Sequence, residues 1–346
     1  MMRIHSEQLS LQLENPFKIS YGATTSRQNV LVHLHDGELT GVGEAAVVPY
    51  YGETPERVCA YFEDPALPNA IGEDLYLLED AFDQLPATAS SAARAAVDMA
   101  LHDLWAKKLG QPLYRLWGLN PDRCATSSYT VALADDEPAY RKLLETACDY
   151  PVVKLKLGSG SIDSDLQFTQ MAMTTLSAQI CVDANGGWSA QDALTIIPHL
   201  AEMGVMFVEQ PVAKADFEGW RTLRHQLPAD MPPLIADESV QGVESILPLA
   251  GLADGINIKL AKCGGLRPAR QMIMLARALG LRIMIGCMVE SSVAISAAAA
   301  LTPLADYADL DGNLLITNDP YRGACNIHGK LTLPDLPGLG VERLVE

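Results

Sequence analysis

The chain has 346 residues, of which 49% are hydrophobic and 20% charged, so it is long enough for two domains or for one large barrel with an addition. Its formal net charge of −18 argues against binding to nucleic acid or to an anionic membrane surface and favours a small-molecule partner. No apolar run is expected to act as a signal peptide or to cross a membrane, and seven scattered cysteines without any CxxC pair predict reduced thiols in a cytoplasm.

The first 120 residues are predicted to form an α+β domain that caps the rest of the chain. Residues 4–13 and 28–45 alternate apolar and polar residues, as half-buried strands do, and a turn at residues 35–38 is expected to join two of the strands. Residues 91–110 then place Ala and Leu at three- and four-residue spacing, which is typical of a helix. Antiparallel strands followed by helices are typical of the α+β class.

Between residues 121 and 320, short apolar strands alternate with helical stretches, which is typical of an α/β fold. Eight strands are expected, at residues 127–133, 152–157, 179–184, 205–211, 234–239, 255–260, 282–287 and 307–312. This pattern predicts a (β/α)7β TIM-like barrel. An open doubly wound sheet would also alternate in this way, but it normally carries a Gly-rich phosphate loop, which this segment lacks. The Gly- and Pro-rich segment from about 321 to 346 is expected to complete the first domain.

Polar side chains recur at the ends of the predicted barrel strands, about one βα unit apart. In such barrels the reactive groups surround the mouth formed by the carboxyl ends of the strands. In chain order these residues are Lys154, Lys156, Asp183, Glu209, Asp237, Lys262, Cys287, Asp309 and Asp311. The spacing therefore predicts that all of them face one mouth.

Three of these residues, Asp183, Glu209 and Asp237, are carboxylates from successive strands. A single acid at a strand end is typical of a helix N-cap or a solvated loop. Three together would repel one another in an apolar cup unless a divalent cation lay between them. Because the set contains only oxygen ligands, the sequence favours Mg²⁺ ahead of Mn²⁺.

Lys154 and Lys156 lie two apart, so their side chains share one face of a strand. In isolation this pattern would be typical of an exposed strand face. Both faces of a barrel strand are covered, so the shared face is expected to be the interior of the mouth. Lys262 lies four strands further round, and a substrate carbon held near the carboxylates would have one lysine on each side.

The motifs KLK, DAN, VEQP, ADES, KLAKCGG and DLDG resemble those of the enolase superfamily, in its muconate lactonizing enzyme subgroup, and within that subgroup the dipeptide epimerases. The resemblance covers nearly the whole chain, including the helix AAVDMALHDLWAKKLGQPL. It implies that Mg²⁺ binds to the three carboxylates, that Lys156 and Lys262 transfer protons, and that Lys154 stays cationic beside the substrate carboxylate. The implied reaction converts L,L to L,D dipeptides at the α-carbon of the C-terminal residue, through a metal-stabilised enediolate.

Asp309 and Asp311 match the D-x-D that binds the substrate α-ammonium in dipeptide epimerases. A strand end that runs into a Gly turn is the simpler alternative for this motif. An N-acylamino acid racemase or an o-succinylbenzoate synthase of the same subgroup is the enzymatic alternative, and N-acylated substrates have no such ammonium. A non-catalytic binding barrel is the alternative from another class.

Relatives that act on Ala-Glu carry an arginine soon after the early PFK motif, whereas this chain has none before Arg27. That departure predicts an uncharged or hydrophobic second residue, which Tyr21, Tyr50 and Tyr51 would suit. An inward swing of Lys18 or Arg27 would instead suit an acidic residue.

Some further contacts are expected at the mouth. Thr130, in the end of the first barrel strand, and Met288, after the seventh, are expected to touch the substrate, and Asn185 is expected to orient a metal ligand. Lys259 is expected to be structural, because on a continuing strand it could not share a face with Lys262. Large barrels of this kind are often symmetric, so a homo-oligomer is one expectation.

Overall fold

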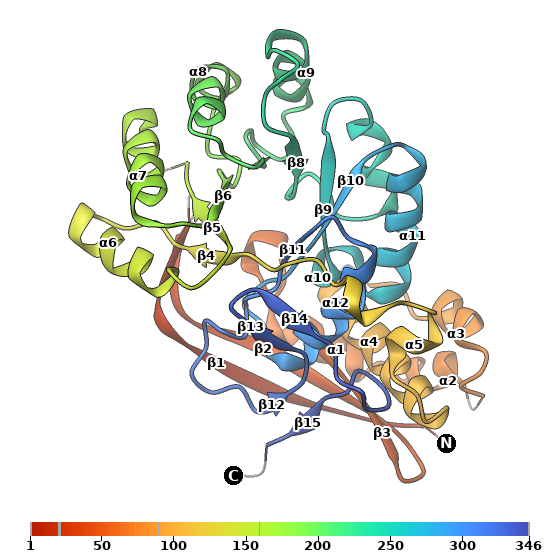
Figure 1. Ribbon diagram of the computed structural model, residues 1–346. Coiled ribbons are helices and arrows are strands. Elements are labelled where there is room, and N and C mark those ends of the chain that lie inside the picture. The colour runs from red at the N-terminus through yellow and green to blue at the C-terminus, as the bar shows by residue number, and fades with distance from the viewer. Residues whose placement is uncertain (1, 20–21, 73, 89, 159, 345–346) are drawn as a thin grey trace.

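The computed structural model describes residues 2–19, 22–72, 74–88, 90–158 and 160–344. An antiparallel sheet with its helices lies beside a barrel of parallel strands (Figure 1). The combination of an N-terminal antiparallel sheet and an α/β barrel is the predicted fold class. No helix in the described part of the chain is long and apolar enough to cross a membrane.

The N-terminal sheet has the order β1-β2-β3, with antiparallel neighbours. The predicted turn after residue 35 is confirmed, because Asp36 pairs with Leu39 across it. The strands are β1 (Arg3–Ile19), β2 (Gly22–Asp36) and β3 (Leu39–Ala45). The helices that follow are α1 (Pro55–Phe62), α2 (Leu67–Ile71), α3 (Leu78–Gln84), α4 (Ser91–Lys108) and α5 (Leu113–Leu116).

Helix α4 packs directly on β3 because two glycines remove the side chains that would separate them. A Cβ atom at Gly43 would lie 1.9 Å from the carbonyl oxygen of Ala96, and one at Gly41 would lie 2.1 Å from that of Ala100. On its other side α4 contacts α10 and α11 of the barrel. The helix therefore connects the sheet to the barrel, and its buried alanines permit both contacts.

The barrel consists of eight strands that all pair in parallel, in sequence order. All eight lie inside the ranges predicted from the sequence. They are β4 (Tyr129–Val131), β5 (Val152–Lys156), β6 (Gln179–Asp183), β7 (Val208–Glu209), β8 (Leu234–Ala236), β9 (Gly255–Lys259), β10 (Arg282–Gly286) and β11 (Tyr307–Asp309). A bridge from Ser127 to Ala308 brings the two ends of this sheet together, so the barrel is nearly closed.

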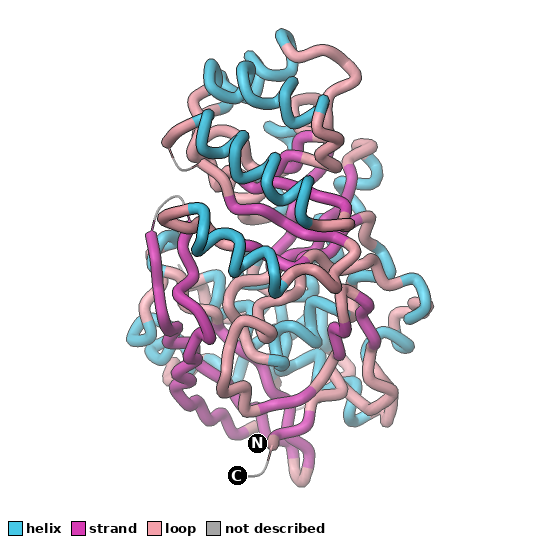
Figure 2. The backbone as a smooth tube through the Cα atoms, turned by 60° about the vertical axis from the view of Figure 1, so that its left-hand side comes forward, coloured by secondary structure: helices cyan, strands magenta, loops and turns pink. Residues whose placement is uncertain are grey.

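Helices cover the outside of the barrel (Figure 2). They are α6 (Glu137–Thr146), α7 (Ile162–Thr175), α8 (Ala190–Glu202), α9 (Phe217–Gln226), α10 (Leu260–Cys263), α11 (Leu266–Ala278) and α12 (Ser292–Ala299). The crossover from β8 to β9 departs from the expected alternation, because it contains two 3-10 turns, Val243–Ser245 and Leu247–Leu249. Pro248 removes a backbone donor from this short segment, which disfavours a longer helix.

The C-terminal segment returns to the N-terminal sheet. Tyr321 packs with Leu9 and Leu31 of β1 and β2, and the Leu339 backbone N–H donates to Asp103 Oδ1 of α4 at 2.8 Å. The strands of this segment are β12 (Tyr321–Arg322), β13 (Cys325–Ile327), β14 (Lys330–Thr332) and β15 (Glu342–Arg343).

Candidate active site

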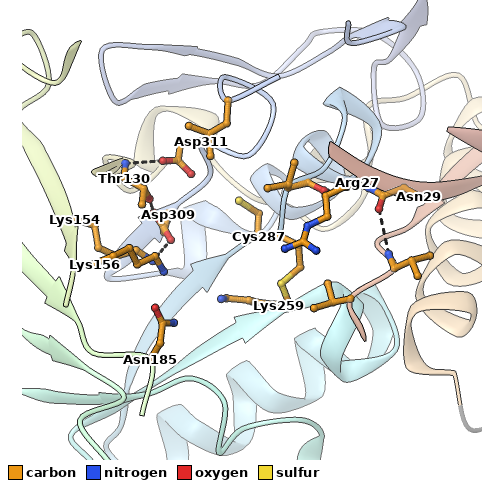
Figure 3. Close-up of a pocket in the computed structure, with 15 residues that line it drawn as sticks. Arg27, Asn29, Thr130, Lys154, Lys156, Asn185, Lys259, Cys287, Asp309 and Asp311 are labelled. Atoms are coloured by element: carbon orange, nitrogen blue, oxygen red, sulfur yellow. Dashed lines mark hydrogen bonds and ion pairs between the residues drawn. The ribbon is translucent and has the colours of Figure 1, made fainter. Parts of the chain in front are cut away.

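A pocket lies between the barrel mouth and the N-terminal sheet (Figure 3). Lys154 and Lys156 extend into it from β5, and Arg27 reaches it from β2 on the other side. The predicted site residues that line this pocket are Thr130, Lys154, Lys156, Asn185, Met288, Asp309 and Asp311. Tyr21, predicted as a substrate contact, lies outside the described residues.

The three predicted metal ligands meet at the carboxyl ends of neighbouring strands. Asp183 ends β6, Glu209 ends β7 and Asp237 follows β8. All three are fully buried, and one carboxylate oxygen of each lies within 4.8 Å of the other two. Burial and the neighbouring Asp183 raise the pKa of Glu209 to about 8. Such crowding of oxygen ligands fits a hard divalent cation such as Mg²⁺.

Lysine side chains approach this triad from two sides. Lys156 Nζ lies 2.7 Å from Asp183 Oδ2, and Lys262 Nζ lies 2.5 Å from Asp237 Oδ1. Burial opposes the charge on Asp237, but the ammonium groups of Lys259 and Lys262 outweigh it and hold the pKa of this carboxyl below its usual range. Two amines therefore reach the same buried triad from different elements, Lys156 from β5 and Lys262 from α10.

Lys154 forms an ion pair with Asp309 and lies 3.4 Å from Glu209 Oε2. Burial disfavours its charge, but Asp309, Glu209 and Asp183 outweigh burial and raise the pKa of Lys154 well above its usual value. Lys154 is therefore a fixed positive charge at neutral pH.

The two aspartates of the D-x-D motif have different partners. Asp309 accepts a hydrogen bond from Ser128 Oγ at 2.6 Å in addition to its pairing with Lys154. Asp311 accepts one from the Thr130 backbone N–H at 2.6 Å. Burial and the negative charge of Asp309 raise the pKa of Asp311 to about 6. Both side chains line the pocket, so together they form a negative region on its β4 side.

Asn185 lies against the triad, where a ligand-orienting residue was expected. Its Nδ2 donates to Asp183 Oδ2 at 3.2 Å and to Glu238 Oε1 at 3.0 Å. Burial, Asp237 and Asp183 raise the pKa of Glu238 to about 7. The amide thus connects one carboxylate of the triad to a second buried acid beside it.

Lys259 was expected to be structural, on the premise that its strand continues to Lys262, and that premise is wrong. Its Nζ lies 2.8 Å from Asp237 Oδ2, and its side chain lines the pocket. Strand β9 ends at Lys259 and helix α10 begins at Leu260, so the chain turns and lets Lys259 and Lys262 reach the same carboxylate. The Gly264-Gly265 pair was the sequence signal for an early end of this strand.

Arg27 lines the pocket, whereas Tyr50 and Tyr51 do not. Tyr51 lines a neighbouring cavity that it shares with Lys262, and the Tyr50 ring lies 4.6 Å from Lys214 Nζ. Figure 3 shows the Arg27 side chain extending toward Cys287 and Lys259. The sequence left the position of Arg27 open, because it depends on how the β1–β2 hairpin crosses the barrel mouth.

Comparison with known proteins gives a consistent result over the whole chain. Residues 3–118 match the family described as mandelate racemase / muconate lactonizing enzyme, N-terminal domain, and residues 139–344 match the enolase C-terminal domain-like family. An L-Ala-D/L-Glu epimerase of Bacteroides thetaiotaomicron is 40% identical over 96% of this chain and 86% of its own length. An L-Ala-D/L-amino acid epimerase of Maribacter sp. is 38% identical over 98% of this chain and 99% of its own length.

A solved structure agrees in fold. It is a dipeptide epimerase from Enterococcus faecalis, complexed with Mg and the dipeptide L-Leu-L-Tyr. It has a TM-score of 0.89 and 30% sequence identity, and it covers 98% of each chain.

Adding Mg²⁺ to the protein after dialysis against a chelator is expected to raise its melting temperature. Binding to the folded state alone stabilises it by about 2.7 kcal/mol when the ion is at one hundred times its dissociation constant. Differential scanning calorimetry measures the shift. Asp237→Asn is expected to abolish it, whereas the exposed acid Asp230, changed to Asn, should leave it intact. A full Mg²⁺ shift in Asp237→Asn would show that the ion binds elsewhere.

Proposed function

The chain belongs to the mandelate racemase / muconate lactonizing enzyme family of the enolase superfamily, and on that premise we propose that it inverts the α-carbon of the C-terminal residue of a dipeptide by proton transfer through two lysines. The names of its relatives support an isomerase that acts on dipeptides. The observation that carries the two-lysine proposal is the approach of Lys156, from β5, and Lys262, from α10, to one carboxylate triad.

The chemistry divides between the triad and the lysines. Mg²⁺ bound by Asp183, Glu209 and Asp237 would supply the positive charge that acidifies a proton α to the substrate carboxylate. One lysine Nζ accepts that proton, and the other donates a proton to the opposite face of the carbon. The carbon is thereby inverted with no net change in protons, and exchange with solvent restores the two lysines.

Lys154 has a different role in this proposal. Its ion pair with Asp309, which is not a member of the triad, favours the protonated amine, so Lys154 would attract the substrate carboxylate and not act as a base. Its burial beside Asp183 and Glu209 supports this role.

The negative region formed by Asp309 and Asp311 supports a substrate with a free ammonium group. Both carboxylates are buried and line the same pocket as Lys154 and Lys156. Asp309 is already paired with Lys154, but an N-acylated amino acid would place a neutral amide beside Asp311 and supply no cation to offset its buried charge. This favours a dipeptide over the substrates of an N-acylamino acid racemase or an o-succinylbenzoate synthase.

For the second residue, the position of Arg27 supports an acidic side chain. The absence of an earlier arginine had favoured an uncharged or hydrophobic residue. Arg27 adds a positive charge to the wall of a pocket that Val289 and Leu315 also line, and a carboxylate is its natural partner. The 40% identical relative named for L-Ala-D/L-Glu is consistent with this preference.

The division of the chain follows from the same proposal. Residues 1–120, completed by about 321–346, would act as a cap that selects the substrate side chain, and the barrel of residues 121–320 would carry the chemistry. Arg27 and Asn29 of the sheet line the pocket together with barrel residues, which supports this division. We place the reaction in the cytoplasm on the evidence of the cysteines alone.

With Mg²⁺ in D₂O, the enzyme is expected to incorporate deuterium at the α-carbon of the C-terminal residue of L-Ala-L-Glu and to form L-Ala-D-Glu, as followed by proton NMR. Changing Asp309 and Asp311 together to Asn should lower kcat/KM by about thirtyfold or more, because losing one partner of a buried charge pair costs about 2 kcal/mol or more. An N-succinyl amino acid serves as the control substrate. Absence of exchange with every member of a dipeptide panel would contradict the proposal and would favour a non-catalytic barrel.

The acid side of the pH profile should report Asp311, whose pKa is raised to about 6. Above that pH the carboxylate is charged and attracts the substrate ammonium, and below it the neutral acid does not. The value of kcat/KM for a dipeptide is therefore expected to fall as the pH drops through about 6. In Asp311→Asn, this fall of kcat/KM at low pH should disappear. If the fall is unchanged in that variant, another group causes it.

Arg27→Met is expected to lower kcat/KM for L-Ala-L-Glu by about tenfold or more, since a hydrogen bond to a charged group contributes about 1.5–3 kcal/mol. L-Ala-L-Leu should be used equally well or better by the variant, and Arg27→Lys should keep part of the preference for the acidic dipeptide. Steady-state kinetics with both dipeptides measure this. Equal effects on both substrates would favour the uncharged preference expected from the sequence.

A further inference from the structure

We propose that two buried carboxylates outside the pocket, Asp165 and Asp98, are positioning residues, and that each holds one of the two lysines in place. Asp165 supports Lys156 and Asp98 supports Lys262. The inference rests on the proposed two-lysine reaction. It predicts that loss of either carboxylate slows proton transfer on one face of the substrate carbon and spares the other.

Asp165 connects the loops that follow β5 and β6. It is fully buried in the first turn of α7. Its Oδ2 accepts hydrogen bonds from the Gly158 backbone N–H at 3.0 Å and from Trp188 Nε1 at 2.8 Å. Gly158 lies two residues after Lys156, and Trp188 lies in the loop that begins after Asp183. One carboxylate oxygen thus connects the loop that follows Lys156 to the loop that follows Asp183.

The loop after β5 packs tightly at this point. Gly158 has a φ of +78°, and a Cβ atom there would lie 2.4 Å from the carbonyl oxygen of Ala184. The Leu157 backbone N–H also donates to the carbonyl of Asp183 at 2.8 Å. Because two backbones meet so closely, a shift of the Gly158 loop moves the end of β5 and, with it, Lys156.

Asp98 acts at the opposite side of the barrel mouth. It lies on α4, 2% exposed, and accepts hydrogen bonds from the backbone N–H groups of Leu266 at 2.6 Å and Arg267 at 3.3 Å. These are the first two residues of α11, and the N-cap residue of that helix, Gly265, has no side chain to cap them. A carboxylate from another element therefore satisfies the N-terminus of α11 and complements its dipole.

Lys262 depends on that support because of the element on which it lies. Helix α10 is a turn of four residues between β9 and α11, so no strand pairing holds it. Gly265 follows closely, and a Cβ atom at that position would lie 2.4 Å from Asp98 Cγ. With Asp98 removed, two helix N–H groups lose their partner, and the start of α11, directly after the turn that carries Lys262, loses its hydrogen bonds to α4.

The two supports are independent of each other. Asp165 lies on α7 and Asp98 on α4, and the hydrogen bonds described above for the two carboxylates have no donor in common. Substitutions at separate sites without shared partners are close to additive. Each substitution is therefore expected to displace its own lysine alone.

This separation makes a positioning role distinguishable from a purely structural one. A lysine can remove the α-proton, exchange it for a solvent deuteron and return the deuteron to the same face, so exchange without inversion needs only one lysine. The L,L and L,D epimers present their α-protons to opposite faces. Exchange from each epimer consequently reports one lysine, whereas a general loss of fold would slow exchange from both.

The experiment measures initial rates of α-proton exchange in D₂O by NMR for the Mg²⁺-loaded enzyme, with L-Ala-L-Glu and L-Ala-D-Glu as separate substrates. Lys156→Ala and Lys262→Ala first identify the epimer that each lysine serves. Asp165→Ala is expected to slow exchange from the epimer that Lys156 deprotonates by about tenfold or more relative to the other epimer. A displacement of a catalytic group by about 1 Å can lower the rate about a hundredfold. Asp98→Ala should shift the ratio in the opposite direction.

Asp165→Asn and Asp98→Asn each keep one acceptor oxygen, so they should change the ratio of the two exchange rates in the same direction but by less. These variants decide the test if the alanine variants do not fold. Asp163→Ala, exposed in the same first turn of α7, should leave the ratio unchanged. Equal slowing of both epimers, or no change in the ratio, would overturn the inference while the two-lysine reaction stands. If the lysine variants themselves showed no preference between epimers, the proposed function would fail, and this inference with it.

Discussion

The crowding of three buried carboxylates at the barrel mouth is the constraint on which the rest of the structure depends. Parallel strands bring Asp183, Glu209 and Asp237 to one rim, and their oxygens lie within 4.8 Å of one another. Charges of one sign cannot be buried so closely without cations. Burial, followed by the charge of Asp183, raises the pKa of Glu209 to about 8. The lysines of the mouth and a divalent cation can both compensate these negative charges, and the reaction we propose uses both.

The N-terminal sheet completes the pocket and is held to the barrel by buried polar contacts. Asn29 Nδ2 donates to Glu44 Oε1 at 2.8 Å and to the carbonyl of Val289 at 3.0 Å. Glu44 in turn accepts from Ser291 at the start of α12, and burial raises its pKa. The loop that carries Met288 is thereby fixed between the sheet and the barrel. Both Asn29 and the nearby Arg27 line the pocket, because these hydrogen bonds hold β2 against that loop.

The sequence predicted the parts of the site that follow from strand periodicity. The acids and lysines at the ends of most barrel strands can be placed without knowledge of tertiary contacts, and the structure brings these residues together. Lys259 was misplaced because the prediction assumed that β9 continues, whereas α10 begins at the next residue. Asp98 and Asp165 carried no local signal at all. The partners of Asp98 lie at Leu266 and Arg267, far along the chain, and only the packing of α4 on α11 brings them together.

The central claim is that a substrate α-carbon lies between Lys156 and Lys262 beside a metal held by the carboxylate triad. A crystal structure of the protein with Mg²⁺ and a bound dipeptide tests this most directly. The account predicts the ion among Asp183, Glu209 and Asp237, with one lysine Nζ on each face of the α-carbon. An ion bound elsewhere, or an α-carbon with both lysines on the same face, would contradict it.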